Sequence, residues 1–391
     1  MEKLYDDYIN GIKALKKKKY IYGAGRVGQA LYGICSENDI DIEAFLVTNA
    51  EQNPTEVQGK QVMKFDETVD ADALILLGVL EHGESEIKKY IKKIGEYQVL
   101  DCPEQILYTI PFYKRKRQAP TMEITPIIGC AVNCKYCPQK LLLREYFKDN
   151  KNRKSYMTLE DFKVCIDKLP KDTVIEWAGF AEPFLNRECI DMMLYANEKG
   201  YDMTLFTTMV GLSEENLERI LKIPFKQVVL HTADKDGYAN IAVTEEYLRL
   251  LEKIVEAKKQ NGNPWVDKAN CQSEPHEKVL EKLKGRLRIY CEMSDRAGNL
   301  DNTENNLKTG EKTGRIYCER ANNMNHNVLL PDGTVVLCCN DFGMQHVLGN
   351  LLEDDYEQLM NSEMMRHIKR GMHIDETLPL LCRKCIYANN I

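Results

Sequence analysis

Three cysteines lie close together in residues 126–140, whose sequence is PIIGCAVNCKYCPQK: Cys130, Cys134 and Cys137. Two thiolates would form a disulfide, and four would close a zinc tetrahedron. The chain shows neither a secretory signal peptide nor an apolar run of transmembrane length. We therefore expect a cytoplasmic protein, in which cysteines at ligand spacing bind metal rather than pair as disulfides.

Three thiolates fit a 4Fe–4S cluster with one open iron, because each of its four irons takes a ligand. An open coordination position is typical of catalytic metal centres. The spacing CxxxCxxC, with Tyr136 before the third cysteine, resembles the motif of the radical S-adenosylmethionine (SAM) superfamily. The resemblance implies that the open iron binds SAM, which is cleaved reductively to a hydrogen-abstracting 5′-deoxyadenosyl radical. The alternative is a zinc site, for which the nearby sequence offers no fourth ligand.

A second segment, EWAGFAEPFLN, resembles the motif with which this superfamily meets the SAM amino group. The matching residues are Gly179, Ala181, Glu182 and Pro183, and Ala181 stands where the superfamily usually has a second glycine. The resemblance implies that these residues contact SAM. The alternative for Glu182 is a carboxylate that caps the following helix.

The elements that position these motifs alternate along the middle of the chain. Strands are expected at 122–129, 174–179, 203–208, 227–232, 264–269 and 286–293, with helices between them, such as 159–169 and 245–259. Six such units predict a partial barrel, in which chemistry occurs at the carboxyl ends of the strands.

Polar residues at these strand ends are further candidates. Thr207, His231 and Arg296 are candidate contacts for SAM or substrate, and an arginine suits a carboxylate. Cys271 is a candidate hydrogen-atom donor to a substrate radical, with plain core packing as the alternative. For each of these residues a structural role is the competing interpretation.

Four cysteines near the C-terminus have the spacing of a closed metal site: Cys318, Cys338, Cys382 and Cys385. The pattern from Cys318 through Gly333 to Cys338 resembles the SPASM domain, which extends many radical SAM enzymes. Because the chain lacks the further cysteines of the full pattern, the resemblance implies one auxiliary 4Fe–4S cluster, as in shortened "twitch" domains. Cys339 is the rival of Cys338, and zinc is the alternative metal. A hairpin is expected at 327–339 and one helix at 356–371.

The N-terminal segment has the pattern strand, glycine turn, helix, strand. Gly23, Gly25 and Gly28 form a GxGxxG turn of the Rossmann type, in which backbone amides and a helix N-terminus face a phosphate. The next strand ends without the acidic residue that would bind a ribose, which argues against NAD. The segment resembles small domains of surface-polysaccharide enzymes. Nucleotide or sugar-phosphate binding and a purely structural role both stay open.

The predicted fold class is α/β. We expect a Rossmann-like domain at 1–112, a partial (βα)6 TIM-like barrel at 113–300 and a SPASM/twitch domain at 301–391. The chain has 391 residues, 43% hydrophobic, with a net charge of −7, which gives no general indication of nucleic-acid binding. The basic segment YKRKRQAP, at 113–120, is interpreted as a solvated linker, with contact to an acidic membrane surface as the alternative.

The expected function is hydrogen abstraction from a small substrate, a sugar or activated sugar, that leads to oxidation or epimerisation. The expected partners are this substrate and an electron donor such as flavodoxin or ferredoxin. A maturase of peptides or protein side chains is the first alternative. The second is a non-enzymatic iron–sulfur or zinc regulator.

Overall fold

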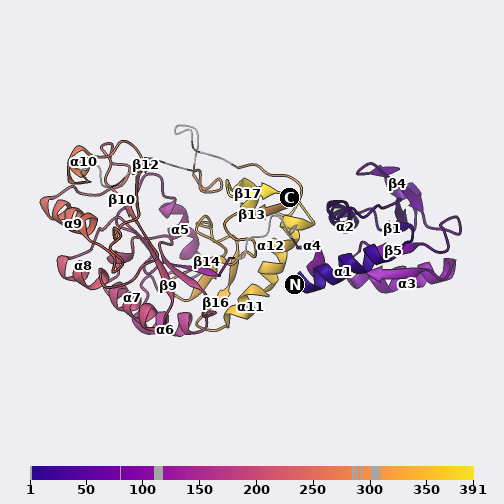
Figure 1. Cartoon of the computed structure of the whole chain (residues 1–391), viewed down its shortest axis with the longest axis horizontal. Helices are drawn as coiled ribbons and strands as arrows, with labels where there is room; N and C mark the ends of the chain where they lie inside the picture. The colour runs from indigo at the N-terminus through magenta and orange to yellow at the C-terminus, as the bar shows by residue number, and fades with distance from the viewer. Residues whose placement is uncertain are drawn as a thin grey trace.

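The computed structural model describes residues 2–79, 81–109, 118–283, 287, 289–291, 294–300, 307 and 310–391. Figure 1 shows a small sheet with its helices at one end and a larger sheet ringed by helices at the other. The yellow C-terminal strands and helices lie between them. Within the described ranges, no helix has both the length and the apolar character needed to cross a bilayer.

The first sheet has the strand order β3-β4-β2-β1-β5-β6, and all its pairings except β3 with β4 are parallel. Its central strands are apolar, and neighbouring residues of β1 and β5 pack into separate cores on the two faces. This is the pattern of a parallel sheet covered on both sides. The elements are α1 (Glu2–Ala14), β1 (Lys19–Tyr22), α2 (Arg26–Glu37), β2 (Phe45–Val47), β3 (Glu56–Val57), β4 (Lys60–Lys64), β5 (Leu74–Leu77), α3 (Glu81–Ile94), β6 (Gln98–Asp101) and α4 (Glu104–Leu107).

In the glycine turn between β1 and α2, close packing requires glycine at two of the three positions. Gly23 has φ +108°, and a Cβ on Gly28 would lie 1.8 Å from the Gly23 carbonyl oxygen. Gly25 is different, because a Cβ there would meet nothing within 4 Å. It precedes α2 without a side-chain capping hydrogen bond.

The larger sheet has the order β12-β11-β10-β9-β8-β7-β14-β15-β16. Its first six strands are parallel, which confirms the predicted α/β class, and β14 extends the sheet beside β7. In the described chain the sheet stays open, since β12 is an edge strand. The strands are β7 (Thr121–Ile124), β8 (Val174–Trp177), β9 (Asp202–Thr207), β10 (Gln227–His231), β11 (Lys268–Cys271), β12 (Ile289–Cys291), β14 (His326–Leu329), β15 (Thr334–Val336) and β16 (Val347–Asn350).

Helices cover the outside of this sheet (Figure 1). They are α5 (Gln139–Tyr146), α6 (Leu159–Asp167), α7 (Cys189–Glu198), α8 (Glu214–Ile220), α9 (Glu245–Glu256) and α10 (Glu277–Leu283). The strand expected at 264–269 begins later, at Lys268. Trp265 lies before the strand, where it is buried and packs edge-on against Phe225, at 5.8 Å between ring centroids. This apolar residue therefore serves the core outside the strand.

The C-terminal region adds a two-stranded sheet of β13 (Ile316–Cys318) and β17 (Ala388–Asn390), together with the 3₁₀ turn η4 (Leu381–Lys384). The expected hairpin forms as β14 and β15. The single helix expected at 356–371 is wrong, because the structure has α11 (Tyr356–Met360) and α12 (Glu363–His373). Ser362 starts α12 as its N-cap, accepting a hydrogen bond from the Met365 amide, so the chain breaks there.

Candidate functional site

A cavity of about 390 Å³ lies at the carboxyl ends of strands β8 to β11. The three-cysteine loop after β7 forms part of its wall. Residues from the C-terminal region, Arg320, Cys339 and Tyr387, also contribute to the lining. The cavity therefore lies at the end of the strands where barrel geometry predicts a functional site. It also joins the three-cysteine loop to the C-terminal region.

Cys130, Cys134 and Cys137 all line the cavity. The Glu182 amide donates to the Cys130 sulfur at 3.5 Å, and the Gln139 side-chain amide donates to the Cys137 sulfur at 3.5 Å. Such hydrogen bonds to sulfur are a means by which proteins tune iron–sulfur clusters. Burial raises the pKa of Cys134 to about 11, so metal binding would release its proton.

The spacing of the sulfurs bears on zinc. In a zinc tetrahedron with bonds of about 2.3 Å, the sulfurs would lie about 3.8 Å apart. In the described part of the chain, no three cysteine sulfurs all lie within 4.8 Å of one another. As they stand, the described cysteines therefore do not have the compact arrangement of a closed zinc tetrahedron.

Glu182 lines the cavity, and its buried carboxylate is held by four donors. Thr207 donates from its hydroxyl at 2.7 Å, and Thr208 donates from both its amide and its hydroxyl at 2.6 Å. The Phe184 amide donates at 3.3 Å, so Glu182 also caps a 3₁₀ turn, as its alternative interpretation held. Burial raises its pKa even against these hydrogen bonds.

Gly179 and Ala181 both line the cavity, but only Gly179 is required sterically. It has φ +51°, and a Cβ there would lie 2.2 Å from the Thr125 hydroxyl oxygen. Thr207 is buried and does not line the cavity; it holds Glu182 instead. Thr207 can therefore influence a ligand in the cavity only indirectly, by holding the Glu182 carboxylate in place.

His231, Arg296 and Tyr136 lie around the same cavity. Burial lowers the pKa of His231 to about 4, although its hydrogen bond with Asn270 opposes this, so its ring is neutral above that pH. Burial raises the pKa of both Tyr136 and Cys137, and the positive charge of Arg296 opposes both shifts. Arg296 thus supplies positive potential beside the three-cysteine loop.

The prediction of Cys271 as a hydrogen donor is not supported by its placement. Asn270 and Gln272 line the cavity on either side of it, whereas Cys271 is buried and absent from the lining. Its thiol donates to the Ser273 carbonyl oxygen at 2.7 Å. Successive residues of a strand point to opposite faces, so a strand that presents Asn270 to the cavity turns Cys271 away.

Sequence reasoning missed a polar cluster at the cavity wall. Glu123, Glu176 and Arg320 line the cavity, and His326 joins them from outside its lining. Glu123 and Glu176 are direct partners on β7 and β8. His326 Nε2 lies 2.7 Å from Glu123 Oε1, and Arg320 Nη2 lies 4.0 Å from a carboxylate oxygen of each glutamate. Two like charges side by side are destabilising, and Arg320 offsets them.

The two glutamates differ in proton affinity. Burial opposes ionisation of Glu123, but the His326 hydrogen bond and Arg320 outweigh it and lower its pKa. Burial, followed by the negative charge of Glu123, raises the pKa of Glu176. Although the Glu123, Glu176 and His326 ligand atoms lie within 4.8 Å, the adjacent guanidinium disfavours a divalent cation. The sequence signal for this cluster was a charged residue within each of two otherwise apolar strands, Glu123 in MEI and Glu176 in VIEW.

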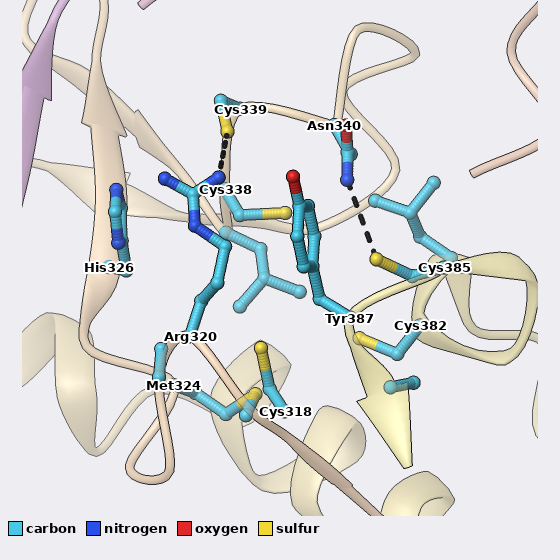
Figure 2. Close-up of a pocket in the computed structure, with 14 residues that line it drawn as sticks. Cys318, Arg320, Met324, His326, Cys338, Cys339, Asn340, Cys382, Cys385 and Tyr387 are labelled. Atoms are coloured by element: carbon cyan, nitrogen blue, oxygen red, sulfur yellow. Dashed lines mark hydrogen bonds between the residues drawn. The ribbon is translucent and has the colours of Figure 1, made fainter. Parts of the chain in front are cut away.

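The four C-terminal cysteines line a second, smaller cavity. Figure 2 shows the sulfurs of Cys318, Cys338, Cys382 and Cys385 around one space, whereas the Cys339 sulfur points toward Arg320. The Arg320 guanidinium donates to Cys339 at 3.4 Å, and the Asn340 amide donates to Cys385 at 3.4 Å. This arrangement supports Cys338 over Cys339 as the fourth ligand.

Comparisons with known proteins agree with this view of the C-terminus. Residues 318–386 match the SPASM family, described as an iron–sulfur cluster-binding domain. The match contains all four cysteines of the second cavity. No curated protein gives a significant match to the chain.

Three similar solved structures illustrate the overall resemblance. BtrN in complex with AdoMet and 2-DOIA has 16% identity and a TM-score of 0.46, covering 71% of this chain and 95% of that one. Polyhistidine-tagged anSMEcpe with bound AdoMet has 15% identity and a TM-score of 0.40, covering 69% and 84%. Streptococcus suis SuiB bound to precursor peptide SuiA has 11% identity and a TM-score of 0.42, covering 86% and 78%.

At these scores the structural similarities carry no conclusion about activity or substrate. The evidence for the C-terminal region is more direct. It consists of the family match, the four sulfurs around one space and the Asn340 amide that donates to Cys385. In residues 318–386, the arrangement of the four cysteines therefore agrees with the matched SPASM family of iron–sulfur cluster-binding domains.

Proposed function

We propose that this chain is a radical SAM enzyme that abstracts a hydrogen atom from a small polar substrate, a sugar or activated sugar. The observation that carries the proposal is one cavity shared by three parts. Cys130, Cys134 and Cys137 form one part of its lining, and Glu182 with its neighbours forms the next. Arg320, Cys339 and Tyr387, which also line the four-cysteine cavity, complete it.

The cluster held by the three cysteines would supply one electron to cleave SAM and release the 5′-deoxyadenosyl radical. The chain's own residues bind and orient the reactants. Glu182 offers a fixed carboxylate for the SAM amino group, because Thr207 and Thr208 hold both its oxygens. Arg296, across the cavity lining, offers a guanidinium for a carboxylate.

The polar cluster of Glu123, Glu176, His326 and Arg320 supports a hydroxylated or amino-bearing substrate. Its carboxylates accept hydrogen bonds from hydroxyl or ammonium groups, and Asn270 and Gln272 add amides to the same lining. A purely apolar substrate would displace water from these polar groups without replacing its hydrogen bonds, which costs binding energy.

Oxidation is the outcome that this wall serves best. After hydrogen abstraction, forming a carbonyl requires the substrate radical to lose one electron and its hydroxyl proton. Glu176, whose pKa is raised, accepts the proton, since a general base is most effective when its pKa approaches the working pH. A cluster held by Cys318, Cys338, Cys382 and Cys385, in the smaller cavity that Arg320 and Cys339 also line, would supply the acceptor for the electron.

The proposal is tested with both clusters reconstituted anaerobically, in the presence of SAM, dithionite and a panel of deuterated sugars and nucleotide sugars. A true substrate transfers deuterium into 5′-deoxyadenosine. Oxidation gives a product two hydrogens lighter, whereas epimerisation gives an isomer that takes up solvent deuterium. Transfer from a peptide substrate and from no sugar would favour the maturase instead. Absence of 5′-deoxyadenosine under all conditions would favour a non-enzymatic regulator.

A further inference from the structure

A third cavity, of about 280 Å³, lies where α2 of the first sheet meets the C-terminal region. We call it the junction cavity. It is lined by Arg26 and Gln58 from the first sheet's side and by Arg315, His373, Glu376 and Arg383 from the other. The proposed radical chemistry does not use it.

The lining of the junction cavity has more guanidiniums than carboxylates, although two of these guanidiniums pair with carboxylates outside the lining. Its lining includes three guanidiniums and one carboxylate, Glu376. Arg26 pairs with Asp375, and Arg315 lies 3.1 Å from Glu37, so each of these pairs also ties the two parts together. Arg383 instead donates to the carbonyl oxygens of Gly314 at 2.7 Å and Gly371 at 2.6 Å.

Several buried polar atoms around this cavity have no partner. Within the described ranges, ten buried side-chain nitrogen or oxygen atoms lack a hydrogen bond. Three of the ten belong to this lining: Arg315 Nε, His373 Nδ1 and Arg383 Nε. Buried polar atoms are rarely left unsatisfied in native structures, so the two unpaired guanidinium Nε–H donors here indicate a missing acceptor.

We propose that the junction cavity binds the phosphate group of a small phosphorylated ligand, such as a pyrophosphate or a sugar phosphate. Guanidiniums match phosphate oxygens in fork geometry. At about 280 Å³ the cavity is smaller than typical pockets for drug-sized ligands, so a whole dinucleotide does not fit inside it. The uncapped start of α2 and the open space at Gly25 leave room for a ligand to extend along the glycine turn.

The site is composite, because neither the first sheet nor the C-terminal region contains all three arginines. Arg383 also lies between Cys382 and Cys385, two ligands proposed for the auxiliary cluster. A ligand in the junction cavity would thus contact the segment that holds that cluster.

The test uses the full chain with its clusters reconstituted, titrated calorimetrically with inorganic phosphate, pyrophosphate, ADP and UDP. We expect one site per chain that prefers pyrophosphate or a nucleoside diphosphate and weakens as salt rises. Gln58→Glu adds a negative charge to the lining at constant size and should weaken binding about three- to tenfold. Arg26→Glu should weaken it further.

Lys64→Glu is the matched control, since Lys64 is exposed on β4 and outside the lining. It changes the charge of the same part of the chain and should leave binding unchanged. All variants should form 5′-deoxyadenosine like the wild type, which shows that they are folded and separates this inference from the proposed function. The inference is overturned if none of the four probes binds, or if the Gln58 and Arg26 variants bind as tightly as the Lys64 control.

Discussion

Gly179→Ala is the substitution whose consequences the structure defines most closely. Gly179 has φ +51°, where an L-residue costs about 1–2 kcal/mol. Its Cβ would lie 2.2 Å from the Thr125 hydroxyl and 2.9 Å from the Ile124 carbonyl oxygen. Thr125 is fully buried and accepts a hydrogen bond from the Phe180 amide at 2.9 Å, so it cannot move aside cheaply. The loop after β8 must shift instead.

The shift matters because Glu182 is three residues further along the same loop. A displacement of about 1 Å in a positioning group can reduce a rate about a hundredfold. We therefore expect Gly179→Ala to weaken SAM binding and to reduce 5′-deoxyadenosine formation by one to two orders of magnitude. Equilibrium dialysis with labelled SAM and a timed assay with dithionite measure the two effects, after iron content has been matched.

Ala181→Gly is the control, since it also changes one methyl group in this loop and should alter both quantities less than threefold. Adding Thr125→Ala to Gly179→Ala removes the nearest clash but leaves the Ile124 contact, so it should restore activity only in part. The reasoning is refuted if Gly179→Ala binds and cleaves SAM as the wild type does. It is also refuted if the Ala181 variant is affected equally.

Three further predictions concern single side chains. Cys338→Ala should lose about four iron atoms per chain, measured after reconstitution, whereas Cys339→Ala should keep them; equal loss would contradict the ligand assignment. Glu176→Gln should still form 5′-deoxyadenosine with a true substrate but should lower oxidised product at least tenfold, measured by mass spectrometry; an unchanged yield would exclude it as the base. Because the folded pKa of His231 is about 4, below its ordinary value of 6.5, its neutral ring should contribute stability above pH 6.5 that is lost as pH falls. His231→Gln should therefore reduce the loss of unfolding free energy between pH 7 and pH 5 by about 1–2 kcal/mol, and urea titrations showing no reduction would contradict this.

The parallel architecture was predictable because the strands are short apolar runs with turn residues at their ends, and these patterns are local. The three-cysteine loop and the segment from Gly179 to Glu182 were found for the same reason, since each is contiguous. The predicted boundaries of helices and strands were wrong where tertiary contacts determine them. The apolar residue Trp265 precedes the strand and packs on Phe225, so it does not belong to the strand that was predicted from it. Ser362 divides the predicted helix in two, although the apolar pattern continues past it.

The rest of the site could not be predicted because it is assembled from distant segments. Glu123 and Glu176 meet only through strand register, and Arg320 and His326 reach them from the C-terminal region. The direction of a side chain on a strand is equally invisible without knowing its register, which is why Cys271 was a poor candidate. The junction cavity likewise exists only where two separate parts of the chain meet.

The central claim is that Cys130, Cys134 and Cys137 hold a cluster with an open iron for SAM. Anaerobically reconstituted protein is mixed with SAM and dithionite, and 5′-deoxyadenosine and methionine are quantified by liquid chromatography. The account predicts that both products appear in equal amounts and that Cys134→Ala, still loaded with the SPASM cluster, forms neither. Iron-loaded wild-type protein that forms no 5′-deoxyadenosine, or a Cys134 variant that forms as much as the wild type, would contradict it.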